Sequence, residues 1–482
     1  MTMFRNILLA TASVFALAAV GCSDPEPQTD PEAVVVTGVT VSPSTLTIYI
    51  GDAPVTLQAE IVPSNADNKA VTWSGDNAYV ATVDPKTGVV TAVGPGKATI
   101  TAATGDGDFE GTCVVTVKDH GDDIVYEFVR EGVETTLNDQ GEQIGRIAWG
   151  LTADGILALS GEGKMKSYFE DLTLETFATD APWFALDVTS VVIQKGITSI
   201  GQLAFAGMEG IEKVTIGRDV EEIGIGAFAF CSELEEVVVG RSVENVRQMA
   251  FFECSSLKGI EFPDALESIY NQAFEGCTSL ATVTVGNQLG GIGAKAFEMC
   301  TALTGIELPD TVAAIGDRAF FGCRSLANAT LGSGLLYLGT GQEIVGGVFE
   351  SCTSLKSIVI PDGVPTIHNG AFYACSALTE VVIGEGVTLI GGNAFDSCTS
   401  LTSITIPAAM ELIDLYAFRN CPALANVTVM GETPPDLYQD YESNNYLSFT
   451  RTDDVLHVPA GSVADYEASR DWSEAFGDIV EQ

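Results

Sequence analysis

Nine cysteines in the second half of the sequence recur at a fixed interval. Successive cysteines are 23 residues apart, except for one step of 29 between the fifth and the sixth. The nine are Cys231, Cys254, Cys277, Cys300, Cys323, Cys352, Cys375, Cys398 and Cys421. A repeat of this length predicts a solenoid, in which each turn buries its apolar side only against the turns above and below. A stacked rod presents surface, so the pattern favours binding as the function.

Apolar residues hold fixed places around each cysteine. A Phe stands three residues before it and a Leu three residues after it, as in Phe297, Cys300 and Leu303. A row with Phe205 but no cysteine precedes the nine, so we expect about ten turns. The recurring apolar positions of one unit are Cys300, Leu303, Ile306, Leu308, Val312, Ile315 and Phe320. So few positions cannot form a core within one turn.

This pattern closely resembles the BspA-like leucine-rich repeats of bacterial and protist surface proteins. The resemblance covers residues 199–430 and implies adhesion or partner binding, without identifying the partner. The fold expected is mainly β with short helical turns. The step of 29 places six extra residues near Gly339 to Gly346. Insertions in solenoids emerge as loops, either as contact sites or as tolerated neutral loops.

The repeat cysteines are predicted to be buried free thiols. They number nine, so they cannot all pair with one another. Side chains in register on stacked turns lie roughly 4.8 Å apart and point the same way. A disulfide needs converging Cβ atoms about 3.8 Å apart. A Cys between Phe and Leu is therefore interpreted as a small apolar filler and not as a metal ligand.

Segments on both sides of the repeats are predicted to cover the open ends of the solenoid. A terminal turn exposes apolar surface and needs a cap. Residues 119–198 are the expected N-terminal cap, with a hairpin from Trp149 to Met165. Residues 431–482 are the expected C-terminal cap, a last strand followed by an amphipathic helix. Its apolar residues at roughly helical spacing are Tyr466, Trp472, Phe476, Ile479 and Val480.

Residues 34–118 contain only strand and turn patterns. Short runs that alternate or are β-branched are separated by Gly, Asn and Asp, which indicates a small β-sandwich. The stretch from Val71-Thr72-Trp73-Ser74 to Gly96-Lys97-Ala98-Thr99 resembles the bacterial Ig-like domain, group 2. The resemblance implies a stalk or interaction module, with Trp73 in the core. Cys113 is alone in this segment, so no disulfide can form within it.

The first residues read as an export signal. Arg5 precedes an apolar stretch that is short for a membrane span, and residues 1–21 end in small residues before Cys22. This resembles the lipobox of bacterial lipoproteins, which implies acylation of Cys22. An ordinary signal peptide cut elsewhere is the alternative. Residues 22–33 are Pro-rich and acidic, as expected for a disordered tether, and resemble the surface-export signal of Bacteroidetes lipoproteins. We therefore expect a lipid anchor in the outer membrane, facing outward or, alternatively, toward the periplasm.

Charge and motif content exclude several functions. The chain has 65 acidic and 22 basic residues, a formal charge of −43, which disfavours nucleic acid as a partner. Its three histidines lie in three different segments, and no P-loop, nucleophile elbow or zinc-protease motif occurs. The sequence therefore predicts no enzyme, no cofactor and no metal site. A basic partner or weak calcium binding remains compatible with the acidic surface.

The candidate binding face follows from the period of two along each strand. Positions five and seven residues after each cysteine should point outward. The candidate residues are Glu236, Glu261, Thr282, Thr284, Glu307, Asn328, Thr330, Glu380 and Thr405. No outward position is aromatic, which argues against sugar stacking on this face, and its glutamates favour a basic partner. The leading hypothesis is a surface lipoprotein that binds an extracellular protein or host matrix component. Glycan capture for polysaccharide uptake is the alternative, and a passive surface-layer element is a third reading.

Overall fold

The chain divides into two compact units. One ends at Val117, and the other runs from Lys118 to Gln482 with Tyr49–Gly51. The computed structural model describes residues 34–49, 53–78, 80–93, 96–105, 109–118, 126–138, 140–168, 179–341, 346–438, 448–449 and 452–482. The predicted signal peptide 1–21, Cys22 and the tether 22–33 lie outside them. The described chain is nearly all β, with two short helices.

The first unit has the predicted antiparallel strands. Its hydrogen-bonded groups are β1-β4, β2-β9-β8-β5 and β3-β7-β6. Trp73 is 6% exposed and Cys113 is fully buried and free, as the sequence predicted. The strands are β1 (Gly38–Ser42), β2 (Thr45–Tyr49), β3 (Val55–Thr56), β4 (Gln58–Val62), β5 (Val71–Gly75), β6 (Ala81–Val83), β7 (Val89–Ala92), β8 (Gly96–Thr104) and β9 (Glu110–Lys118).

The second unit begins with three antiparallel strands, β10 (Phe128–Leu137), β11 (Gln143–Thr152) and β12 (Ile156–Lys164). The predicted hairpin is the β11–β12 pair, in which Ala148 lies opposite Ser160. Strand β10 was not predicted, because its apolar residues are separated by charged residues and glycine. β12 then pairs in parallel with β13 and β14, which joins the antiparallel strands to the solenoid.

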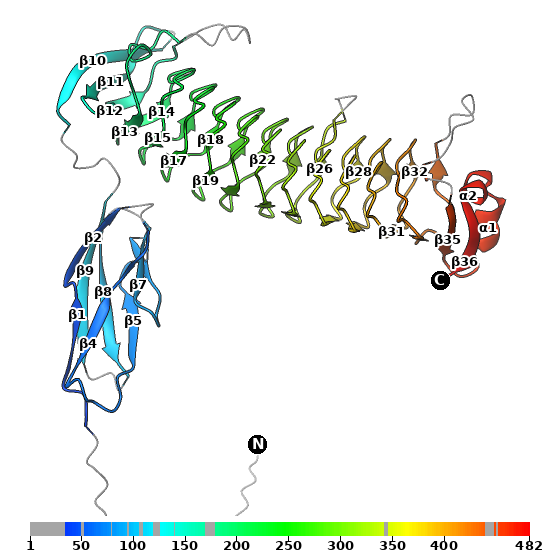
Figure 1. Ribbon diagram of the computed structural model, residues 1–482, viewed down its shortest axis with the longest axis horizontal. Helices are drawn as coiled ribbons and strands as arrows, with labels where there is room; N and C mark the ends of the chain where they lie inside the picture. Colours follow the sequence, from blue (N-terminus) through cyan, green and yellow to red (C-terminus); the bar gives the residue numbers. More distant parts are fainter. Residues whose placement is uncertain are drawn as a thin grey trace, which may run out of the picture. The chain divides into compact units, whose positions relative to one another are not determined.

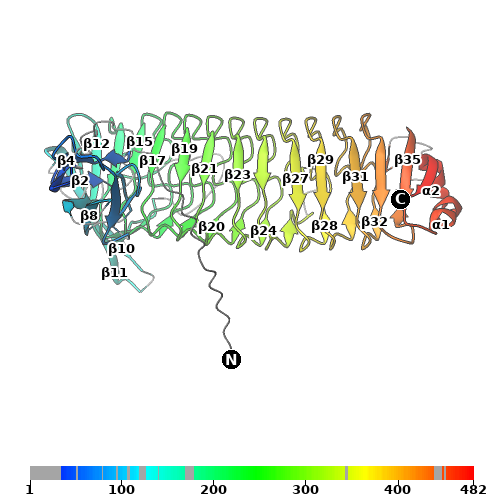
Figure 2. The same ribbon diagram turned by 90° about the horizontal axis from the view of Figure 1, so that it is seen from below.

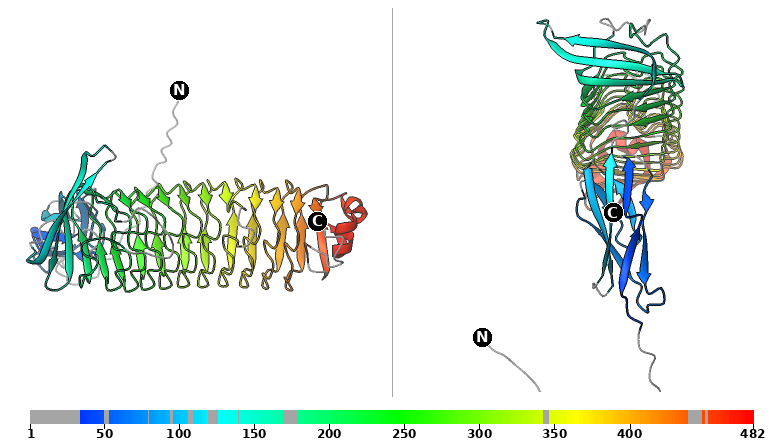
Figure 3. Two further views of the ribbon diagram at one scale, coloured as in Figure 1. Left: turned by 90° about the horizontal axis from the view of Figure 1, so that it is seen from above. Right: turned by 90° about the vertical axis from the view of Figure 1, so that its left-hand side faces the viewer.

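The solenoid runs for about 12 turns within the described residues. Each turn contributes a strand to each of two faces, which Figure 2 and Figure 3 show as stacked rows. The long-strand face contains β13 (Ser190–Ile193), β15 (Lys213–Thr215), β17 (Glu236–Val238), β19 (Gly259–Glu261), β21 (Thr282–Thr284), β23 (Gly305–Glu307), β25 (Asn328–Thr330), β27 (Ser357–Ile360), β29 (Glu380–Ile383), β31 (Ser403–Ile406) and β33 (Asn426–Val429). The short-strand face contains β14 (Ile197–Ile200), β16 (Glu222–Ile223), β18 (Asn245–Val246), β20 (Ser268–Ile269), β22 (Gly291–Ile292), β24 (Ala314–Ile315), β26 (Tyr337–Leu338), β28 (Thr366–Ile367), β30 (Leu389–Ile390), β32 (Leu412–Ile413) and β34 (Asp436–Leu437).

One turn lies inside the segment that we expected to be the N-terminal cap. Strand β13 pairs in parallel with β15, and Ser190 lies opposite Lys213, 23 residues later. Strand β14 pairs with β16 in the same way. The 23-residue repeat of the solenoid therefore begins before residue 199. The sequence did not reveal this turn because it lacks the Phe and Cys landmarks of the later ones.

A continuous aromatic column runs through the core. The repeat phenylalanines are fully buried, and neighbouring rings from Phe205 to Phe449 stack with centroids 4.8–5.5 Å apart. These separations match favourable offset stacking, which adds to the burial of apolar area. The column ends on Trp183 at one end of the solenoid and on Trp472 at the other. Each ring is therefore covered by the rings of adjacent turns, as a solenoid requires.

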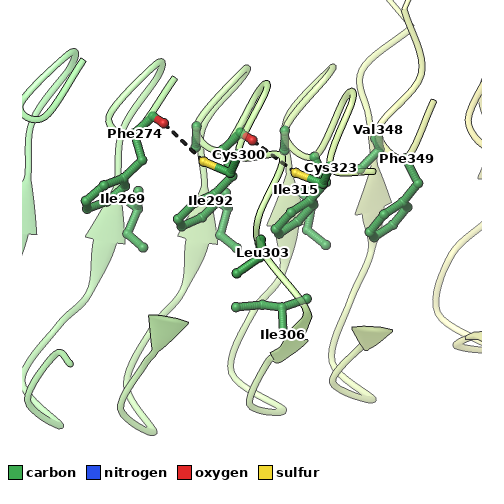
Figure 4. Packing of buried hydrophobic residues seen from close by; sticks show 14 of the residues in the cluster. Ile269, Phe274, Ile292, Cys300, Leu303, Ile306, Ile315, Cys323, Val348 and Phe349 are labelled. Atoms are coloured by element: carbon green, nitrogen blue, oxygen red, sulfur yellow. Dashed lines mark hydrogen bonds between the residues drawn. The ribbon is translucent and has the colours of Figure 1, made fainter. Parts of the chain in front are cut away.

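The repeat cysteines are buried and free, as predicted, and each also makes a hydrogen bond. The thiol of Cys300 donates to the carbonyl of Phe274 at 3.2 Å, and the thiol of Cys323 donates to the carbonyl of Phe297 at 3.1 Å (Figure 4). The other repeat cysteines make the equivalent bond, so these hydrogen bonds continue from turn to turn. Because of burial, the pKa of Cys375 is raised to about 12. The thiols therefore link adjacent turns as well as filling the core.

We expect all nine repeat thiols to be unreactive in the native protein. Their burial and raised pKa values keep them protonated, and the thiolate is the reactive form. Treatment with a thiol-specific alkylating reagent at pH 8 should leave them unmodified, whereas the denatured protein should be alkylated at all nine. Peptide mapping by mass spectrometry measures both. Disulfides between adjacent turns, or labelling of native Cys300, would contradict the prediction.

The C-terminal cap differs from the predicted strand and single helix. It consists of β35 (Thr452–Val458), α1 (Val463–Ala468), α2 (Arg470–Ala475) and β36 (Phe476–Glu481), coloured red at the end of the chain in Figure 1. Tyr466 and Trp472 are fully buried, as a cap requires. The predicted helix is wrong beyond Ala475, because Ile479 and Val480 lie on a strand parallel to β35. Gly477 disfavours helix, and β-branched residues favour strand.

Candidate binding faces of the solenoid

The predicted site residues all lie on the long-strand face and are exposed. Glu236, Glu261 and Glu307 lie on β17, β19 and β23. The central residue of each of these strands is buried, so the glutamate and the residue at the other end of the strand point outward. Parallel pairing places residues of successive turns directly beside one another, as in Glu261 and Thr284. The remaining predicted residues, all exposed on β21, β25, β29 and β31, are Thr282, Thr284, Asn328, Thr330, Glu380 and Thr405. The predicted set therefore forms one surface.

The charges on this face are not all acidic, in contrast to the prediction. Lys213 on β15 lies beside Glu236, and its Nζ is 2.7 Å from Glu236 Oε1. The prediction missed this pair because the outward positions were counted only from Cys231 onward. Among the described residues, Glu261, Glu307 and Glu380 form no ion pair. These three carboxylates are therefore available to a partner in solvent.

The same face carries a small apolar patch. Val359 on β27 is 58% exposed and lies opposite Val382 on β29, which is 47% exposed. Thr330 and Thr405 occupy the corresponding positions of neighbouring turns. The long-strand face thus combines hydroxyl groups, isolated carboxylates and one apolar spot. It has the composition of a flat contact surface.

The short-strand face carries a group of side chains that the repeat pattern did not reveal. The guanidinium of Arg247 donates to Glu222 and lies 4.7 Å from the ring centroid of Tyr270. This contact has the geometry of a cation–π interaction. Arg247 and Tyr270 occupy the same position of consecutive turns, and Glu222 lies two positions earlier in the preceding turn, but the residue types do not repeat and so gave no periodic signal. Arg247 thus contacts both Glu222 and Tyr270, and Tyr270 remains 37% exposed to solvent.

The insertion leaves the core intact. Phe320 and Phe349, which flank it, stack at 5.2 Å like the other pairs. The buried carboxylate of Asp317 accepts hydrogen bonds from the N–H groups of Thr340 and Gly341, which fixes the start of the loop. Residues 342–345 lie outside the described part. The extra length therefore leaves the aromatic column continuous.

The buried titratable side chains of the described residues are mostly engaged within the solenoid. No group of three or more His, Cys, Asp or Glu side chains is placed to hold a metal among the described residues. The buried carboxylates instead pair with arginines, as Glu298 does with Arg318 and Asp396 with Arg419. His368 is half-buried, which lowers its pKa and favours the neutral form. These groups stabilise the corners between turns.

A stack of parallel-strand turns with a buried Phe–Cys core defines a leucine-rich-repeat solenoid. The model for the BspA type leucine rich repeat region matches residues 183–304 and 342–434, in six copies. The model for the bacterial Ig-like domain (group 2) matches residues 35–115. The chain is therefore a BspA-type leucine-rich repeat protein with a bacterial Ig-like domain. Proteins of this type are cell-surface proteins and generally serve as non-enzymatic scaffolds that bind other proteins.

Individual relatives match parts of the chain. An Ig-like virion protein of Serratia phage KSP90 is 45% identical over 84 residues, 17% of this chain and 32% of the phage protein. A lacto-N-biosidase of Bifidobacterium bifidum is 40% identical over 98 residues, 20% of this chain and 8% of that enzyme. A leucine rich cell surface protein of Faecalibacterium prausnitzii has 23% identity and a TM-score of 0.35, covering 72% of this chain and 95% of its own.

The described residues contain no helix with the length and apolar character needed to cross a membrane.

Proposed function

We propose that this protein is a lipid-anchored surface protein that binds a basic extracellular protein or host matrix component through the long-strand face. The observation that carries the proposal is the presence of exposed Glu261, Glu307 and Glu380 on this one face, among exposed hydroxyl side chains. Such carboxylates attract cationic partners over a distance of about 8 Å at physiological ionic strength. The family's general role in protein binding supports the same conclusion.

The size of the face is sufficient for this role. Strands of a sheet lie about 4.8 Å apart, so ten strands span roughly 48 Å. A standard interface needs about 800 Å² on each partner. The small side chains on most outward positions leave the face flat, and Val359 and Val382 on β27 and β29 offer apolar area. A broad contact steered by charge fits this surface.

Charge reversal tests the proposal. We expect Glu261→Lys/Glu307→Lys to weaken binding of a basic matrix protein at least about tenfold at low salt, because repulsion replaces attraction. The matched control is Glu385→Lys/Glu411→Lys, which changes the same charge at exposed residues outside the face. Surface plasmon resonance at several salt concentrations measures both. Equal weakening by the two variants, or binding that ignores salt, would reject the electrostatic role of the face.

The lipid anchor at Cys22 and outward display from the outer membrane are part of the proposal. Small residues precede Cys22, and an acidic, Pro-rich segment follows it. An extended tether would let the solenoid reach partners beyond the membrane surface. The Ig-like domain then serves as a spacer between anchor and solenoid.

A further inference from the structure

A hollow lies at one corner of the solenoid, away from the long-strand face. Each turn has a corner residue just before its Ala-Phe pair, and successive turns place Gln272, Lys295, Arg318, Gly347, Gly370, Asn393 and Tyr416 there. Non-glycine residues at this corner adopt a positive φ, for example 59° at Lys295 and 56° at Asn393. Such a backbone is costly for them. In this series, two consecutive turns carry glycine at this position, Gly347 and Gly370, and therefore have no side chain there.

A cavity of about 340 Å³ lies at this corner, with Gly346 and Gly370 in its lining. Its lining residues are Gly346, Glu350, Asn369, Gly370, Tyr373, Gly392, Asn393 and Arg419. A Cβ added at Gly370 would lie 3.5 Å from its nearest neighbour, so the absence of a side chain leaves usable space there. The volume is at the lower end of the range for small-molecule sites, which suits one small ligand unit.

The polar side chains of the hollow are held in place by hydrogen bonds and keep further donor and acceptor atoms for a ligand. Asn369 accepts the N–H of Gly392 at 2.8 Å through Oδ1, which leaves its Nδ2 to donate. Glu350 accepts the N–H of Gly347 at 3.1 Å through Oε2, which leaves Oε1 to accept. The side-chain amide of Asn393 makes no hydrogen bond to another described residue, whereas its backbone N–H donates to the carbonyl of Leu415. The hollow therefore offers both donors and acceptors.

Arg419 is oriented by a carboxylate behind it. Asp396 is fully buried and accepts hydrogen bonds from Nε and Nη2 of Arg419, and also from Asn420. This pairing fixes the guanidinium plane and leaves Nη1 as a further donor. The pairing also neutralises the arginine, so the carboxylate of Glu350, whose pKa is raised by burial, is the acidic group among the lining residues. An anionic ligand is disfavoured for that reason.

We propose that this hollow binds one neutral sugar residue of a glycan. Sugar hydroxyls both donate and accept hydrogen bonds, which matches the amides of Asn369 and Asn393 and the carboxylate of Glu350. Tyr373 supplies an aromatic ring in the lining, which the long-strand face lacks. The hollow is separate from the long-strand face. Sugar binding by the hollow and protein binding by that face can therefore be tested, and rejected, independently of each other.

Gly370→Asn provides the sharpest variant, because Asn tolerates a positive φ and its side chain would fill the hollow. The matched control is Gly461→Asn, where φ is 86° and an added Cβ meets nothing within 4 Å. Glu350→Gln tests the acceptor and retains an oxygen for the Gly347 N–H. The probes are methyl glycosides of glucose, galactose, mannose, N-acetylglucosamine and glucuronic acid, and neutral trisaccharides, observed by saturation-transfer difference NMR on residues 34–482.

We expect binding of at least one neutral probe, loss of it in Gly370→Asn, and retention in Gly461→Asn. Glu350→Gln should weaken it about tenfold, since one charge-assisted hydrogen bond is lost. Thermal unfolding should confirm that each variant is folded. Absence of binding by every probe, preference for the glucuronide, or equal binding by Gly370→Asn would overturn the proposal.

Discussion

Phe320→Ala is expected to lower the free energy of unfolding by about 3–5 kcal/mol. The ring is fully buried and stacks on Phe297 at 5.4 Å and on Phe349 at 5.2 Å. Truncation removes both ring contacts and leaves a cavity that the neighbouring turns cannot fill without shifting their register. Because each turn contacts only its neighbours, the loss should also reduce the cooperativity between the two halves of the solenoid.

Urea unfolding followed by circular dichroism measures this effect, and hydrogen exchange shows where stability is lost. Phe320→Leu retains much of the volume and should cost about 1.5 kcal/mol or less. Thr282→Ala changes an exposed residue and should stay within about 0.5 kcal/mol of the parent. A Phe320→Ala protein that unfolds like Thr282→Ala would contradict the role of the aromatic column.

Cys22→Ala is expected to move the protein from the membrane fraction to the soluble fraction almost completely. Each buried methylene of an acyl chain contributes roughly 0.8 kcal/mol, so several chains on one cysteine anchor the protein stably. Removing the acylated residue abolishes this attachment. Fractionation of cells with immunoblotting measures the distribution. Ser23→Ala is the control and should stay with the membranes, whereas a Cys22→Ala protein that also stays there would refute the anchor.

The repeat core could be predicted because its signal is periodic. Phe297, Cys300 and Leu303 occupy the same places in turn after turn, and a strand places alternate residues on opposite faces. The exposed positions of Glu261 and Glu307 followed from the same alternation. Burial of the thiols followed from their apolar neighbours, although the hydrogen bond from Cys300 to the Phe274 carbonyl did not.

Features that break the period could not be predicted. Lys213 precedes the first repeat cysteine, so its pairing with Glu236 was missed. The hollow is lined by Gly346 and Gly370 and by side chains from four turns, which only the stacking brings together. The switch to strand at Phe476 depends on pairing with β35, because tertiary contacts override a helical spacing of apolar residues.

Hydrogen–deuterium exchange on residues 34–482, free and bound to a basic matrix protein that it captures, tests the central claim most directly. The proposed contact predicts slower exchange in peptides that contain β19, β23 and β29 of the long-strand face. Peptides of the Ig-like domain and of the short-strand face should be unchanged. Protection confined to residues 34–118 or to the short-strand face would contradict the account.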